Sequence, residues 1–140
     1  MNAFVALVYS ATLFSSQPAH FRDLFPVEHA AEVIRVTQKH FRADRESLPI
    51  PRNEAMRIVQ SSAAAGLGAW CGVEWQPYYL AFMRSERDKA WSDEQLTFIG
   101  MLFGMAQGSM QKSMAKTPCE SGDRESVARM LQHVPMPGER

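Results

Sequence analysis

The chain has 140 residues, of which 46% are apolar and 21% are charged, a composition that fits one globular domain and argues against wholesale disorder. Lysine and arginine together number 15, as do aspartate and glutamate, so the formal net charge is zero. Proteins that bind nucleic acid usually carry an excess of basic charge, and a polybasic patch is the usual attachment to an anionic membrane surface. We therefore expect neither kind of partner.

An uncharged apolar run over residues 3–14 begins the chain. It is too short for a transmembrane helix, which needs about 20 apolar residues, so we expect no integral membrane segment. It has the length of a signal peptide, but no Lys or Arg precedes it and the candidate cleavage site is poor. Two interpretations of segment 1–20 stay open: an uncleaved first helix or strand, or a poor signal peptide. A helical domain over 21–133 and a non-helical tail over 134–140 follow.

Helical periodicity then predicts three helices in succession. Apolar residues recur at helical spacing over 27–41 and again over 52–70. Gly72 is a plausible left-handed terminator of the second of these helices. Pro77, which a first helical turn tolerates, starts another helix over 77–90, whose outer face carries charges of both signs.

The longest predicted helix covers residues 92–116. Ser92 and Gln95 have the spacing of a capping box, which marks a helix start. Apolar side chains cover more than half of the circumference of this helix, which is typical of a central core helix. A last short helix, capped by Ser121 or Asp123, precedes the tail. The sequence therefore predicts an all-α, single-domain bundle of about five helices around the central helix 92–116.

Three glycines spaced four residues apart interrupt the central helix: Gly100, Gly104 and Gly108. Each costs about 1 kcal/mol relative to alanine, so we expect a compensating contact. Small residues at this spacing let another backbone come close, and the small-residue run 61–69 is the expected partner inside the chain. The alternative is that the glycines, edged by Gln107 and Gln111, form the floor of a groove for a ligand or a partner's helix.

The two cysteines, Cys71 and Cys119, follow the second and the fourth predicted helix. Short connections favour antiparallel neighbours, which brings both cysteines to the same end of the bundle. We therefore predict a disulfide between them, and we favour the periplasm or secretion over the cytoplasm because disulfides persist in oxidising compartments. No Cys-x-x-Cys motif supports a zinc site or a thioredoxin-like activity.

Aromatic residues gather around the turn between the second and third predicted helices, beside a single acidic residue. They form either a corner of the core or a binding surface, since Trp and Tyr dominate binding sites. His29 and Glu32 have helical spacing but are too few for a metal site, so we expect no metal or other cofactor. The candidate ligand-binding or partner-binding residues are Trp70, Glu74, Trp75, Tyr78, Tyr79, Trp91, Gly104, Gln107 and Gln111.

The sequence contains no catalytic constellation or phosphate-binding motif, whereas residue types used in packing and interfaces are abundant. We therefore favour a small non-enzymatic binding protein that acts through protein–protein contacts, as an inhibitor or immunity-type partner, or by self-association. The alternative is a small-molecule-binding protein or an enzyme with a pocket around Trp70, Trp75 and Tyr79 and with Glu74 as its polar group. An enclosed cavity lined by these aromatic residues would favour the alternative, and a solid core would favour the first hypothesis.

Overall fold

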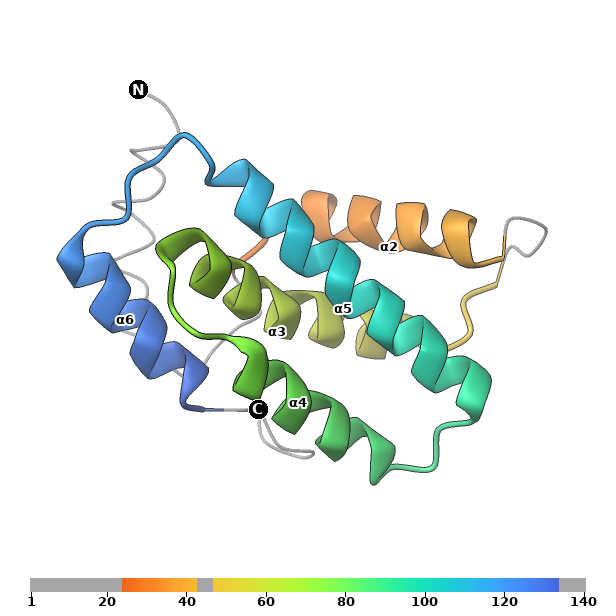
Figure 1. The fold of residues 1–140 in the computed structure, drawn as a ribbon. Helices are drawn as coiled ribbons and strands as arrows, with labels where there is room; N and C mark the ends of the chain where they lie inside the picture. Colours follow the sequence, from red (N-terminus) through yellow and green to blue (C-terminus); the bar gives the residue numbers. More distant parts are fainter. Residues whose placement is uncertain (1–23, 43–46, 134–140) are drawn as a thin grey trace.

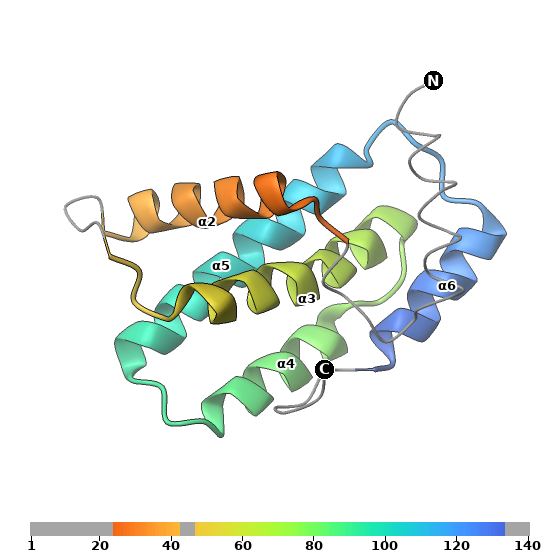
Figure 2. The ribbon, with the colours of Figure 1, turned by 180° about the vertical axis from the view of Figure 1, so that it is seen from behind.

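The computed structural model describes residues 24–42 and 47–133, and within these ranges the chain is all-α and forms one domain (Figures 1 and 2). The predicted fold class is therefore confirmed. The interpretations of segments 1–20 and 134–140 concern residues that lie outside the described ranges. The helices are α2 (Val27–Phe41), α3 (Arg52–Cys71), α4 (Gln76–Arg87), α5 (Asp93–Ser113) and α6 (Ser121–Leu131).

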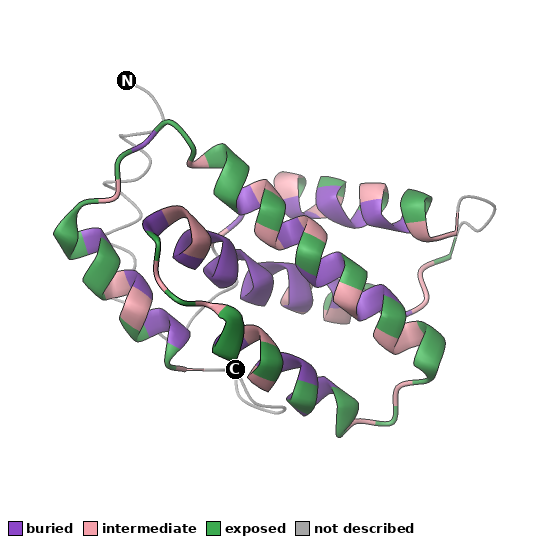
Figure 3. Ribbon diagram, viewed as in Figure 1, coloured by how far each residue is buried: buried purple, intermediate pink, exposed green. Residues whose placement is uncertain are grey.

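Helices α3 and α5 pack closely against each other and form the centre of the bundle. Helix α2 packs on both of them, and α6 covers part of α3. The central role predicted for helix 92–116, which is α5 in the structure, is confirmed. Helix α3 shares this role, because every residue from Ile58 to Gly68 is buried (Figure 3). Because most side chains in this stretch of α3 are small, neighbours can surround the helix on all sides.

The closest approach of α3 to α5 is at Gly66. A Cβ atom at this position would lie 2.5 Å from the carbonyl oxygen of Gln107 and 2.7 Å from the Cβ of Met110. Both distances are below normal van der Waals contact, so any side chain here would force the two helices apart. The three alanines before Gly66 are fully buried. The small residues of α3 therefore accommodate the large apolar side chains of α5.

The prediction that the three glycines of α5 pack against α3 is wrong. A Cβ at Gly104 or Gly108 would meet no atom of the described residues within 4 Å, and one at Gly100 would meet only the end of Met83, at 4.0 Å. The reason is that the large side chains on the opposite sector of α5 fill the space beside α3. Small residues on one helix are matched by large residues on the other, so the glycines of α5 face outward.

Two predicted helix ends are confirmed, the start of α5 at Ser92 and the end of α3 at Gly72. The hydroxyl of Ser92 accepts a hydrogen bond from the Gln95 N–H (3.1 Å), and the Gln95 side chain accepts one from the Ser92 N–H (2.8 Å). Gly72 has a left-handed conformation (φ 70°), as predicted for a terminator. Helices α4 and α5 end about three residues earlier than predicted, because tight i to i−3 hydrogen bonds close their last turns.

Buried polar side chains connect the outer helices to α3. The Gln60 side chain donates to the Phe25 carbonyl (2.9 Å) and accepts from the Phe25 N–H (2.8 Å), which ties the start of α2 to α3. The Tyr78 hydroxyl donates to the Ser61 carbonyl (2.8 Å), which ties α4 to the same part of α3. Burial raises the pKa of the Tyr78 phenol well above its usual range, so this donor keeps its proton.

A buried carboxylate fastens the other end of α4. Glu86 lies 3.0 Å from the Arg57 guanidinium and 3.3 Å from the Lys89 amine, and its second oxygen accepts from the Trp91 indole N–H at 2.9 Å. Glu86 is 1% exposed, and a carboxylate so buried needs this set of partners. The network joins α3, α4 and the connection to α5.

Cys71 and Cys119 form the predicted disulfide, with their α-carbons 5.3 Å apart. The bond joins the end of α3 to the segment between α5 and α6. Helix α6 follows directly and buries the apolar side chains of Val127, Met130 and Leu131. The disulfide therefore tethers α6 to the helix against which it packs.

The contrast between Gly66 and Gly104 predicts opposite effects of the same substitution. Gly66→Ala should destabilise the protein by about 1–3 kcal/mol, because the added methyl overlaps the backbone of α5. Gly104→Ala should stabilise it by up to about 1 kcal/mol, because alanine favours the helix and the added methyl would meet no described residue within 4 Å. Chemical unfolding followed by circular dichroism measures both changes, and a loss of stability in Gly104→Ala would contradict the outward placement of this glycine.

Loss of the disulfide should lower the free energy of unfolding by about 2–4 kcal/mol, because the bond restricts the unfolded chain. The measurement is guanidinium unfolding of the wild type, with and without reductant, beside the Cys71→Ser/Cys119→Ser double variant. Reductant should have no effect on the double variant, which serves as the control. An unfolding midpoint that reductant leaves unchanged in the wild type would contradict the tethering role of the disulfide.

Candidate functional site

An open pocket of about 510 Å³ lies where the connection between α3 and α4 faces α5. Its size falls in the range of sites that bind small ligands or single side chains of a partner. It brings together four of the residues that the sequence analysis proposed for binding, from two distant parts of the chain. The lining residues are Ala69, Gly72, Val73, Glu74, Trp75, Gln76, Gln107 and Gln111.

The turn after α3 positions one wall of this pocket. Gly72 reverses the chain, and the Val73 N–H then bonds to the Gly68 carbonyl at 2.8 Å. A Cβ at Gly68 would lie only 3.1 Å from the Cβ of Trp75, so a larger residue at 68 would push this wall outward. The other wall is α5, where Gln107 and Gln111 are one helical turn apart.

Three polar groups that line the pocket have no partner among the described residues. The side-chain amides of Gln107 and Gln111 and the carboxylate of Glu74 make no hydrogen bond or ion pair within residues 24–42 and 47–133. The neighbouring Gln76 side chain, in contrast, accepts from the Trp75 N–H at 3.2 Å. The pocket therefore offers two amides and one negative charge to a ligand.

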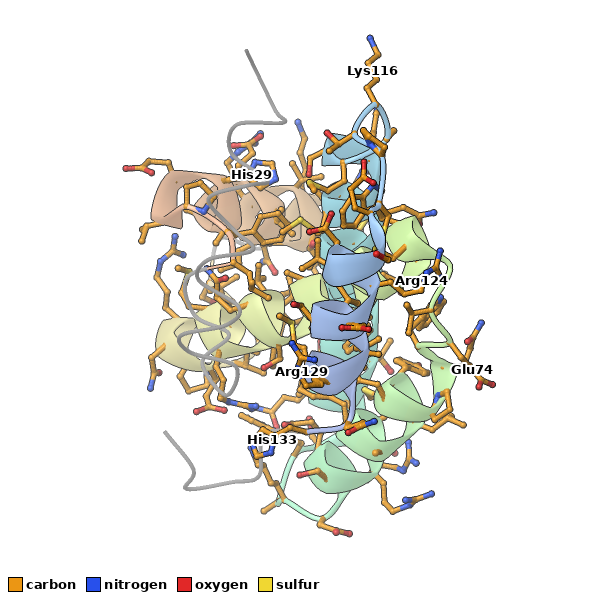
Figure 4. All side chains as sticks on the ribbon, turned by 90° about the vertical axis from the view of Figure 1, so that its left-hand side faces the viewer. His29, Glu74, Lys116, Arg124, Arg129 and His133 are labelled. Atoms are coloured by element: carbon orange, nitrogen blue, oxygen red, sulfur yellow. A yellow bond between two sulfur atoms is a disulfide. The ribbon has the colours of Figure 1, made fainter. Side chains whose placement is uncertain are left out.

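Arg124 of α6 lies close to Gly72, one of the residues that line the pocket, and sequence reasoning missed it. Its guanidinium is 3.7 Å from the position that a Cβ of Gly72 would occupy. Figure 4 shows Arg124 and Glu74 on the same side of the molecule. No sequence pattern connects residue 124 with residue 72, because their proximity depends on how α6 packs against α3.

A stripe of exposed and half-buried residues continues from the pocket along α5, and we call it the outer α5 stripe: Gly100, Gly104, Gln107 and Gln111. Their spacing of four, three and four residues places them on one face of the helix. Gly104 is exposed, and Gly100 borders Met83 of α4. The backbone of α5 is therefore accessible beside the pocket without an intervening side chain.

The other predicted site residues are held in the packing of the bundle. The Trp70 indole N–H donates to the Thr117 carbonyl at 2.6 Å, whereas the Trp91 indole N–H belongs to the Glu86 network. Tyr78 is buried, and Tyr79 lies edge-on to the Phe103 ring with centroids 5.0 Å apart. Trp75 lines the pocket, but Trp70 and Tyr79 do not. The structure therefore separates the aromatic residues of the predicted cavity instead of joining them.

One histidine–serine pair resembles part of a catalytic triad. The His29 ring nitrogen Nε2 lies 2.9 Å from the Ser109 hydroxyl, across the interface of α2 and α5. The nearby Glu32 is engaged by Arg35, whose hydrogen bonds hold the pKa of this carboxyl below its usual range. Ser109 lies inside a helix, where backbone N–H groups are already bonded and cannot form an oxyanion hole. We interpret the pair as a contact between helices.

The described residues contain no cluster of three or more His, Cys, Asp or Glu side chains that could hold a metal ion. Each helix in the described ranges is too short or too polar to cross a bilayer. No known protein family, characterised protein or solved structure shows significant similarity to this chain. The clues to function therefore come from the geometry of the pocket and of the outer α5 stripe.

Proposed function

We propose that this protein is a small non-enzymatic binding protein that engages a polypeptide partner through the pocket and the outer α5 stripe. The observation that supports it is the combination, on one face, of polar groups and helix glycines that have no partner and no close packing contact among residues 24–42 and 47–133. This surface is rigidly supported, because α5 packs on α3 and the disulfide holds the end of α3.

The glycines strengthen the proposal for an energetic reason. Gly104 and Gly108 each cost α5 about 1 kcal/mol relative to alanine. No described residue approaches them closely enough to offset this cost. A partner that packs directly against the backbone of α5 would make use of the missing side chains, as small residues do wherever helices approach closely.

A small-molecule carrier or an enzyme has weaker support. The pocket is open, and Trp75 is its one aromatic lining residue within the described part of the chain, whereas small-molecule sites usually bury most of their ligand against several apolar side chains. The proposal extends to location: a structural disulfide favours the periplasm or secretion, where such bonds persist.

The test is capture of partners from the native source with three forms of the protein: the wild type, Gly104→Leu and Gly122→Leu. Gly104→Leu places a large side chain on the outer α5 stripe. Gly122→Leu makes the same change at an exposed glycine of α6, where a Cβ would also meet no atom of the described residues within 4 Å. We expect Gly104→Leu to lose a protein that both the wild type and Gly122→Leu capture, while all three forms remain folded.

Quantitative mass spectrometry compares the captured proteins, and purified candidates are then tested for direct binding. An identical set of captured proteins for all three forms would contradict the proposed surface. Loss of the same protein from both variants would also contradict it, because the effect would then not be specific to the α5 face.

A further inference from the structure

We propose that the partner segment bound by this pocket is an extended polypeptide whose main chain pairs with the side-chain amides of Gln107 and Gln111 and whose basic side chain pairs with Glu74. This inference rests on the proposed function, and it specifies the conformation and the charge of the bound segment.

The spacing of the two glutamines matches an extended chain. Residues four apart on a helix are separated by about 6.0 Å along the axis, since each residue rises 1.5 Å. An extended chain repeats every two residues, or about 6.6 Å, so its alternate residues present their N–H and C=O groups at nearly the same spacing. Gln107 and Gln111 can therefore pair with alternate residues of one extended segment that runs along α5.

Gln60 shows the same chemistry inside this protein. Its side-chain amide pairs with both the N–H and the C=O of Phe25, at 2.8 and 2.9 Å. Phe25 belongs to the non-helical segment before α2. A glutamine amide has a donor and an acceptor side by side, which is what one residue of an extended chain requires. Gln107 and Gln111 have the same groups and no partner among the described residues.

The charges at the pocket indicate which side chain the segment carries. Glu74 is exposed, forms no ion pair within the described ranges and lines the same pocket as Trp75. A carboxylate beside an indole suits a lysine or arginine, whose aliphatic part can cover the ring while its charge meets the carboxylate. Arg124, whose guanidinium lies close to Gly72 of the pocket lining, would repel a second basic group, so we expect one basic residue at a fixed position.

The experiment selects dodecapeptides from a random phage-displayed library on the immobilised full chain with its disulfide intact. The selected peptides are synthesised, and their dissociation constants are measured by fluorescence anisotropy. The test variants are Gln107→Ala/Gln111→Ala and Glu74→Gln. The matched controls are Lys112→Ala and Glu125→Gln, which alter exposed residues of α5 and α6 that do not line the pocket.

We expect selected peptides that share one lysine or arginine position. The double glutamine variant should bind them about tenfold more weakly or worse, because the hydrogen bonds of both amides to the peptide main chain are lost. Glu74→Gln should lose the preference for lysine over norleucine at the shared position. Replacing alternate peptide N–H groups by ester oxygens should weaken binding to the wild type, whereas the intervening replacements and both control variants should have no effect.

Several results would overturn the inference. In one, the selection yields no peptide that binds specifically. In another, the selected peptides bind the glutamine and Glu74 variants as tightly as they bind the wild type. Binding that a central proline abolishes but ester replacements do not affect would indicate a helical segment instead. A lower melting temperature of the double glutamine variant without peptide would indicate that the protein's own chain fills the pocket. A concentration-dependent dimer that this variant disrupts would indicate a second copy.

Failure of this inference is distinguishable from failure of the proposed function. If a captured partner depends on Gly104 but no extended peptide binds, the proposed surface stands and the partner presents a folded surface. If capture does not depend on Gly104, the proposed function fails at that step, whatever the peptide selection gives.

Discussion

The close contact between α3 and α5 at Gly66 is the constraint on which the rest of this structure depends. A Cβ at this position would overlap the α5 backbone, so the two helices approach as closely as they do only because residue 66 is a glycine. The alanines before it extend the contact along α3. Burial of α3 on all sides follows, and the other helices then pack around this pair.

The same contact determines which face of α5 is available for binding. Large side chains of α5 fill the space beside α3, so the opposite sector, with its glycines, faces outward. The end of α3 is fixed by the Cys71–Cys119 disulfide and by the bond from Trp70 to the Thr117 carbonyl. The turn that follows α3 therefore holds Glu74 and Trp75 in place opposite Gln107 and Gln111. In this way internal packing positions the pocket whose polar groups we assign to a partner.

Local signals in the sequence predicted much of the fold. The capping box at Ser92, the terminator at Gly72 and the periodicity of each helix depend on neighbouring residues, so they can be recognised without a structure. The disulfide was also predictable, because short connections make the helices antiparallel. Each of these features follows from residue spacing or from the lengths of the connections, both of which can be read from the sequence.

The orientation of the glycines was not predictable in the same way. Small residues on α3 and glycines on α5 suggested that the two sets face each other, whereas the structure pairs the small residues of α3 with the large residues of α5. The two arrangements have similar helical periodicity, and only packing volumes distinguish them. The roles of Trp70 and Trp91 were not predictable for a similar reason. The Trp70 indole N–H binds the carbonyl of Thr117, which is distant in the sequence, and the Trp91 indole N–H binds the carboxylate of Glu86, whose burial only the structure shows. Glu74, Trp75, Gln107 and Gln111 could be named as candidates, but their meeting in one pocket required the structure.

Native-state hydrogen exchange, followed residue by residue by NMR, tests most directly whether the α3–α5 contact holds the structure together. We predict that the amides of residues 63–68 exchange only through global unfolding, with a free energy of opening equal to the global free energy of unfolding. Amides of α2 and α6 should exchange through smaller openings. Exchange of residues 63–68 through an opening well below the global free energy, while α2 or α6 remains protected, would contradict this account.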